Sequence, residues 1–187
     1  TSIGPKGEAI KQIINDNLVI HLDAGNKNSY SGSGSTWTDT VGSLAFTLMN
    51  GPTYDAGNGG SLVFSPTSSQ FADGPSLASS LSTWTVELWH YYDGTNAGSD
   101  PGAIGACIVT ETYTGTPNAI NYTLGNANSS TITDLQAGFW TGAPWHTTGT
   151  GITLTTNTWN QIVGTYDGST IKLYINNSLV SSTSYSG

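Results

Sequence analysis

The segment that most constrains the fold lies near the end of the chain and reads TWNQIVGTYDGSTIKLYINNSLV over residues 158–180. Apolar and polar residues alternate in the runs 161–166 and 171–176, which is the period of a β-strand. Asp167-Gly168-Ser169 separates the two runs, and Asn176-Asn177-Ser178 follows the second, both typical of tight turns. The segment therefore predicts three antiparallel strands joined by two turns.

Short apolar runs separated by Gly, Pro, Asn or Asp continue this pattern over most of the chain. Residues Pro5–Asn17 differ, because Ile10, Ile13 and Ile14 recur there at helical spacing and predict one short helix. Many short strands without helices among them favour a β-sandwich or barrel. The other predicted strands are LVIHLDAG (18–25, ending in a turn), SLVFS (61–65), TWTVELWHYY (83–92), ACIVTETYT (106–114), AINYTLG (119–125), LQAGFWT (135–141), PWHTTG (144–149) and GITLTT (151–156).

Composition narrows the class of partner. The 187 residues are enough for one domain with a sizeable core. Charged residues make up 9%, the net charge is −8, there is no Arg, and the four Lys are scattered. Nucleic acid needs a basic footprint, so we expect no nucleic-acid partner. No apolar run approaches the roughly 20 residues of a membrane-spanning helix, so we expect no membrane partner. The lone Cys107 has no internal disulfide partner.

Four segments carry a family resemblance: LVIHLDAGNKNSYSGSGSTWTD (18–39), MNGPTYDAGNGGSLVFS (49–65), STWTVELWHYY (82–92) and NTWNQIVGTYDGSTIKLYINNSLV (157–180). In this order they resemble the laminin-G-like branch of the concanavalin A-like lectin/glucanase superfamily, of the type found in phage virion structural proteins. The resemblance implies an all-β fold, a two-sheet antiparallel jelly-roll sandwich over residues 17–187, preceded by a short helical arm or linker at residues 1–16. Such domains usually continue with two more strands, so the resemblance implies a sandwich that lacks its closing strands. We expect the polypeptide to continue past Gly187 or a partner to complete it, and the arm to anchor a larger assembly.

The superfamily that the chain resembles includes glucanases, which implies glycoside hydrolysis as a candidate activity. This reaction needs two carboxylates flanking the glycosidic bond. The chain has only Glu8, Glu87 and Glu111, and the strand that holds Glu87 has no acidic residue two or four positions further on. We therefore interpret Glu87 as a hydrogen-bonded structural carboxylate. Three histidines leave a Ser-His-Asp triad open by number, but no Gly-x-Ser-x-Gly turn links a strand to a helix. We expect no enzyme activity.

Calcium is bound by many relatives, whose copies often read Trp-x-Asp-x-Ser-Gly-Asn-Gly-Asn. This chain retains only Trp37 and Asp39 of that motif. Because a hard cation needs six or more oxygen ligands, we expect no metal site and no other cofactor. Asp39 is then interpreted as the carboxylate of a turn.

Carbohydrate binding would use exposed aromatic rings beside amides and carboxylates. The segment DLQAGFWTGAPWHTTG (134–149) supplies such residues near turns, with Tyr113 and Tyr122 flanking the preceding loop. The alternative is that these rings pack in the core, as large aromatic side chains usually do, and Trp84 and Trp159 are assigned there. The predicted ligand-binding residues are Tyr113, Asp134, Gln136, Trp140, Trp145 and His146.

The resemblance implies a function without catalysis. We expect a virion structural protein, either a phage head decoration or a tail or fibre adhesion module. It would contact other virion proteins or copies of itself, together with a cell-surface glycan. The alternative is an extracellular carbohydrate-binding module of a secreted bacterial protein, and a hydrolase is a third candidate.

Overall fold

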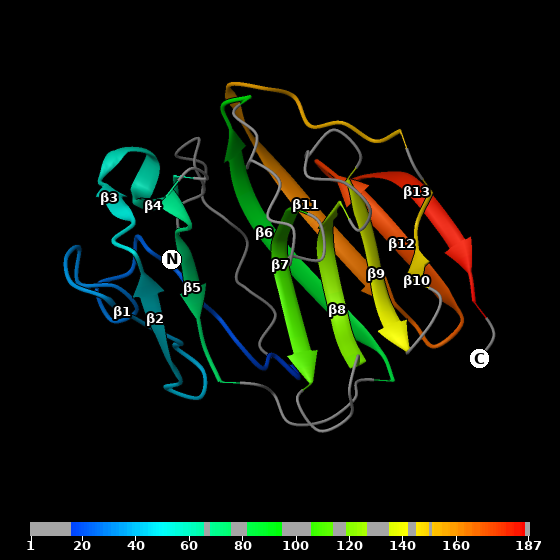
Figure 1. Cartoon of the computed structure of the whole chain (residues 1–187), viewed down its shortest axis with the longest axis horizontal. Coiled ribbons are helices and arrows are strands. Elements are labelled where there is room, and N and C mark those ends of the chain that lie inside the picture. Colours follow the sequence, from blue (N-terminus) through cyan, green and yellow to red (C-terminus); the bar gives the residue numbers. More distant parts are fainter. Residues whose placement is uncertain are drawn as a thin grey trace. The chain divides into compact units, whose positions relative to one another are not determined.

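The computed structural model describes residues 16–65, 68–75, 82–94, 106–113, 119–126, 135–141, 145–149 and 151–185. The chain divides into two compact units, Thr1–Pro75 and Ser76–Gly187 (Figure 1). Within the described residues all strand pairs are antiparallel and helix is limited to short 3-10 turns such as η1 (Gly57–Gly59), so the all-β class is confirmed. The predicted N-terminal helix lies outside the described residues except for Asp16 and Asn17, which form a turn and give the helical arm no support.

The first unit contains two small sheets. Strands β1 (Thr36–Thr38), β2 (Ala45–Met49) and β5 (Phe71–Asp73) pair in the order β1-β2-β5, and β3 (Thr53–Asp55) pairs with β4 (Ser61–Val63). The strand predicted in LVIHLDAG is wrong, because residues 18–23 form no ladder with another strand. The backbone of His21 instead receives a hydrogen bond from Thr40 and donates one to the Asp39 side chain. The turn predicted at the end of that segment is present, with Asn26 N donating to Asp23 O at 3.1 Å.

Asp39 organises the loop between β1 and β2. Its side chain is 1% exposed, and its Oδ1 accepts the backbone N–H groups of His21 (2.6 Å) and Val41 (3.1 Å). Its Oδ2 accepts the N–H of Gly42 at 2.5 Å. Three backbone donors are thereby satisfied by one buried carboxylate, which confirms the interpretation of Asp39 as a turn residue.

A second turn in this unit joins β2 to β3 at Asn50-Gly51. Both residues have positive φ, 59° and 68°, the left-handed conformation that Asn and Gly tolerate best. Asn50 Nδ2 donates to Ser69 O at 2.6 Å, and Gln70 Nε2 donates to the carbonyls of Asn50 and Gly51 at 3.0 Å each. Side-chain amides thus hold this turn against the segment that leads into β5.

The second unit contains two four-stranded antiparallel sheets. One has the order β13-β12-β11-β6, formed by β6 (Trp84–Tyr92), β11 (Thr158–Tyr166), β12 (Thr170–Ile175) and β13 (Ser178–Ser184). The other has the order β10-β9-β8-β7, formed by β7 (Ala106–Tyr113), β8 (Ala119–Asn126), β9 (Gln136–Thr141) and β10 (Trp145–Thr147). The strands predicted in these segments are confirmed, and Figure 1 shows the two sheets overlapping.

The strand predicted in GITLTT is wrong, because residues 151–155 form no strand. Its apolar residues are nevertheless used for packing, since Leu154 is buried in the core. Its backbone makes an isolated contact with the sheet, in which Leu135 N donates to Ile152 O at 2.7 Å. An apolar run can therefore fill a core without entering a ladder.

One apolar core joins the two sheets of this unit. Alternate residues of β11 and β12 face it, with Ile162, Ile171 and Leu173 each 0% exposed, and β9 contributes Ala137 and Phe139. Full burial of one such aliphatic side chain contributes about 1.5–3 kcal/mol. The remaining members of the core are Trp84, Tyr92, Leu135 and Leu154. The sandwich expected from the sequence is consistent with this arrangement.

The two tryptophans predicted to lie in the core differ in their burial. Trp84 is 6% exposed and belongs to the core, as predicted. Trp159 is only half-buried and is not a core member, so its assignment was wrong. The register explains this, because Trp159 pairs with the exposed Tyr91, one position away from the core-facing Asn160.

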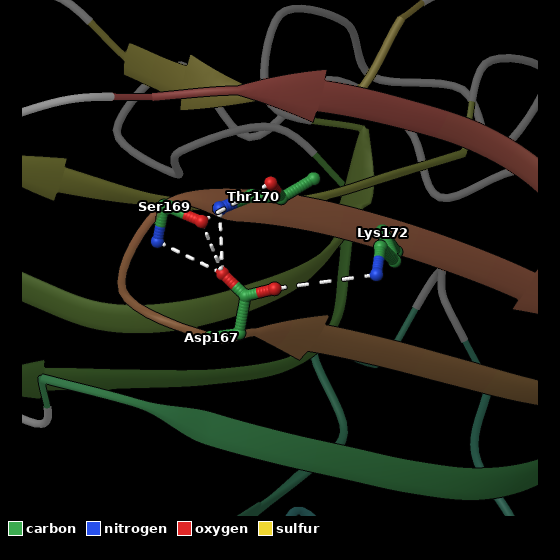
Figure 2. A network of polar contacts seen from close by, with 4 residues as sticks. All are labelled: Asp167, Ser169, Thr170 and Lys172. Carbon is green, nitrogen blue, oxygen red and sulfur yellow. Dashed lines mark hydrogen bonds and ion pairs between the residues drawn. The ribbon is translucent and has the colours of Figure 1, made fainter.

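The turn between β11 and β12 is built around Asp167 (Figure 2). Its Oδ1 accepts the N–H of Ser169 (2.9 Å), the hydroxyl of Ser169 (2.8 Å) and the N–H of Thr170 (2.8 Å). These hydrogen bonds, first of all the one from the Ser169 hydroxyl, lower the pKa of Asp167. Lys172 Nζ lies 4.0 Å from Asp167 Oδ2. This exposed ion pair contributes little to the stability of the fold. Gly168 supplies the positive φ of 94° that closes the turn.

The next turn, between β12 and β13, has Asn176 and Asn177 at φ of 50° and 65°. Two successive residues with positive φ are what a two-residue hairpin turn of the right twist requires. Asn176 also extends the pairing of β11 with β12, because its N–H donates to Gln161 O at 2.9 Å and its Oδ1 accepts Gln161 N–H at 3.0 Å. This fixes the backbone of Gln161, a residue of the candidate site.

Candidate functional site

The six predicted ligand-binding residues fall mainly on β9 and β10. Gln136 and Trp140 lie on β9, Trp145 and His146 on β10, and Tyr113 is the last residue of β7. The register places Trp140 opposite Trp145, and Phe139 opposite His146. Outside the described part of the chain lie Asp134 and the side chains of Tyr113, Tyr122, Trp140 and Trp145.

The two predicted residues whose side chains are described do not share a surface. Gln136 is 1% exposed, so its amide is out of reach of a ligand in solution. The ring of His146 is half-buried and contacts Phe139 and Tyr185, at centroid distances of 5.3 and 4.0 Å. His146 pairs with Phe139, three positions from Gln136, so the two residues fall on opposite faces of the sheet. Within the described residues, this segment provides core packing.

A different group of residues gathers on the outward face of β6 and β11. Along β6, Val86 and Leu88 pack against the core, so the alternate positions point away from it. Trp89 and Tyr91 are 40% and 46% exposed, unusually high for such large rings. We call this group the sheet-face patch, and it consists of Glu87, Trp89, Tyr91, Trp159 and Gln161.

The register brings the patch together across the two strands. Trp89 lies directly opposite Gln161, and Tyr91 directly opposite Trp159. The rings of Tyr91 and Trp159 meet edge to face, with centroids 5.7 Å apart and planes at 67°. Gln161 Nε2 donates to Glu87 Oε1 at 2.6 Å. Two exposed rings therefore lie beside a carboxylate–amide pair on a rigid sheet.

Glu87 makes the hydrogen bond that the sequence analysis expected of it. It lies opposite Val163 and binds Gln161, neither of which is acidic.

Among the described residues, no group of three or more His, Cys, Asp or Glu side chains could hold a metal ion. In the Asp39 turn of the first unit, both carboxylate oxygens accept backbone N–H groups. The sheet-face patch therefore offers the exposed rings of Trp89 and Tyr91 for stacking and polar groups for hydrogen bonds, rather than a metal site.

The patch was missed from the sequence although a signal was present. In TWTVELWHYY, Glu87, Trp89 and Tyr91 alternate with Val86 and Leu88. If Val86 and Leu88 are taken as core-facing, the period of two places the other three residues outward together.

Comparison with known proteins identifies the family. Residues 65–187 match a family model described as the concanavalin A-like lectin/glucanases superfamily. The chain belongs to this superfamily. The match covers all of the second unit, including both sheets and the sheet-face patch. It confirms the resemblance at the level of the superfamily for the segments 82–92 and 157–180, whereas 18–39 and nearly all of 49–65 lie outside the matched residues.

The chain matches no curated protein and no solved structure. Among the described residues, none belongs to a helix long and apolar enough to cross a membrane.

Proposed function

We propose that this chain is a non-enzymatic binding module of a phage virion, serving as a head decoration or as a tail or fibre adhesion module that contacts a glycan. The observation that carries the binding role is the sheet-face patch, where Trp89 and Tyr91 are exposed beside the Glu87–Gln161 pair. Exposed rings next to amide and carboxylate groups suit the C–H faces and hydroxyls of sugars. The resemblance of the sequence to copies in phage structural proteins supports the virion location.

The surroundings of Glu87 favour a role without catalysis. A glycosidase needs a second carboxylate about 5–9 Å from the first. The neighbours of Glu87 across β11 are Val163 and Gln161, and the Gln161 amide binds its carboxylate. A carboxylate held by an amide suits ligand binding or structure better than acid catalysis.

The enzymatic alternative is tested by incubating the chain with laminarin, agarose and alginate and measuring reducing ends. We expect no release above a heat-inactivated control. Turnover that disappears in the Glu87→Gln variant would show that the chain is a hydrolase and that this proposal is wrong.

The virion location is tested on phage particles purified from a culture of the source. The chain should co-sediment with particles in a density gradient at a fixed copy number, measured by quantitative mass spectrometry.

A second candidate, a carbohydrate-binding module of a secreted bacterial protein, is favoured by the aromatic and amide character of the patch. Recovery of the chain only in the particle-free culture medium would select that candidate.

A further inference from the structure

We infer that the second unit holds a single long-lived water molecule at the margin of its apolar core, between the side chains of His90 and Asn160. The water donates one hydrogen bond to Asn160 Oδ1 and forms a second with His90 Nδ1. This internal site is on the opposite side of the sheet from the sheet-face patch, because both residues occupy core-facing positions of β6 and β11.

The strand register brings the two polar side chains together. His90 and Asn160 are directly opposite each other in the ladder of β6 and β11. Leu88 and Tyr92, two positions before and after His90, both pack in the apolar core, so His90 faces the same side. Asn160 is 0% exposed and lies two positions from the core residue Ile162. Directly opposite residues have Cβ atoms about 4.5–5.5 Å apart, so the two side chains leave their strands as neighbours.

The amide of Asn160 is held in one orientation. Its Nδ2 donates to Thr155 O at 3.0 Å and to Thr158 O at 3.1 Å. A reversed amide would place Oδ1 against these two carbonyl oxygens, so the orientation is fixed. The remaining atom, Oδ1, is buried and has no hydrogen-bond partner among the described residues. An acceptor left unpaired in this way costs about 1–3 kcal/mol.

The imidazole of His90 presents a second buried atom of the same kind. Nδ1 has no hydrogen-bond partner in the described part of the chain, and it does not bond to Asn160 Oδ1 although the two residues are cross-strand neighbours. Burial lowers the pKa of His90, with Asp93 partly opposing it, so the ring is neutral at pH 7. Nδ1 of a neutral ring is a donor in one tautomer and an acceptor in the other.

Water matches this pair of atoms in either tautomer. One O–H donates to Asn160 Oδ1, and the other O–H or an oxygen lone pair serves His90 Nδ1. Buried waters in proteins typically make 2–4 hydrogen bonds to groups that the chain itself leaves unsatisfied. A metal ion is a poorer match, because no cluster of three or more His, Cys, Asp or Glu side chains occurs among the residues that the structure describes.

Water-selective NMR on the full, isotopically labelled chain at pH 7 tests for this molecule. We expect water to show contacts with the side-chain amide protons of Asn160 and the ring C–H protons of His90. The NOE and the ROE should have opposite signs, which marks a water that stays bound rather than exchanging with the solvent at a surface. Oxygen-17 relaxation dispersion of the solvent measures the long-lived water independently.

The variant His90→Phe removes Nδ1 and retains an aromatic ring beside Tyr92, whose ring lies 6.2 Å from that of His90. It should lose the water contact at Asn160 and lower the oxygen-17 dispersion by the contribution of a single molecule. His21→Phe is the matched control, because His21 Nδ1 has a protein partner, Thr40 Oγ1, at 2.8 Å. The control should leave the dispersion unchanged.

Three results would overturn the inference. The first is a wild type without a long-lived water contact at either residue, which decides the question even if His90→Phe fails to fold. The second is a His90→Phe variant that keeps both the contact at Asn160 and the full dispersion, since His90 then holds no water. The third is a scalar coupling across a direct hydrogen bond from His90 Nδ1–H to Asn160 Oδ1, which would leave no room for a bridging molecule.

Discussion

Replacing Asp39 by Asn should loosen the loop between β1 and β2 although the two side chains have nearly the same shape. The Asn oxygen can still accept the N–H groups of His21 and Val41, which Oδ1 accepts at 2.6 and 3.1 Å. The amide nitrogen, however, replaces Oδ2, the acceptor for Gly42 N–H at 2.5 Å. Two donors then face each other in a site where the side chain is 1% exposed.

The magnitude follows from these three contacts. A hydrogen bond to a charged group contributes about 1.5–3 kcal/mol and a neutral one about 0.5–1.5 kcal/mol, so one lost and two weakened bonds sum to about 4 kcal/mol. Removing a buried charge returns part of this as relieved desolvation. We therefore expect a net loss of about 2 kcal/mol, or about 30-fold in the equilibrium for opening the loop.

Lowering the pH should reduce the difference in stability between the wild type and the Asp39→Asn variant. Burial alone would raise the pKa of Asp39, but the backbone N–H groups of His21, Gly42 and Val41 outweigh it and lower the pKa below 3.8. A lowered pKa means that the carboxylate stabilises the fold above about pH 4 and that this contribution is lost as the pH falls through the folded-state value. The Asn variant lacks this dependence.

The assay is amide hydrogen exchange by NMR at residues 21, 41 and 42, together with thermal melting at pH 7 and pH 2.5. Val41→Ala is the control, because the Val41 side chain is 48% exposed and its N–H is retained. The control should exchange within about twofold of the wild type. If the three amides of the Asn variant exchange less than threefold faster, or if the melting difference is no smaller at pH 2.5 than at pH 7, the carboxylate does not hold this loop.

Three further predictions concern the second unit. Burial lowers the pKa of His90, with Asp93 partly opposing it, so the wild type should lose stability as the pH falls below about 6.5 while His90→Gln should not; parallel pH profiles would contradict this. Asn177→Ala should cost about 1 kcal/mol in thermal melting because φ is 65°, whereas Asn177→Gly should not, and equal melting of the two variants would argue against the turn geometry. Leu173→Ala, at a site 0% exposed, should lose about 2–5 kcal/mol in urea unfolding, against about 0.5 kcal/mol or less for the exposed Leu179→Ala; similar losses would mean that Leu173 is not in the core.

The sequence predicted best where periodicity and turn chemistry agreed. In residues 158–184, sustained alternation is interrupted only at Asp167-Gly168 and Asn176-Asn177, so both the strands and their connections were predictable. LVIHLDAG and GITLTT have similar composition but make isolated contacts, through His21 and Ile152, that no local pattern encodes. Whether an apolar run joins a ladder depends on partners distant in sequence.

The candidate site was harder to predict because the same residue types serve in cores and on surfaces. Trp159 was assigned to the core from its size, yet its position relative to Ile162 places it outward. The composition of the segment containing Gln136 predicted ligand binding, but the side chain of Gln136 is buried in the strand. Register, which depends on pairing between strands, decides these cases.

The Asn50-Gly51 turn is a site of slow chemical change in the first unit. An Asn followed by Gly is the sequence most prone to deamidation, in which the following backbone nitrogen attacks the side-chain amide, ammonia leaves, and hydrolysis yields an acid. Here Asn50 Nδ2 is bound to Ser69 O at 2.6 Å, which restrains the amide in the folded protein. Once converted, the new carboxylate would confront the Ser69 carbonyl instead of donating to it. The rate of deamidation at Asn50 should therefore follow local opening of the Asn50–Ser69 contact.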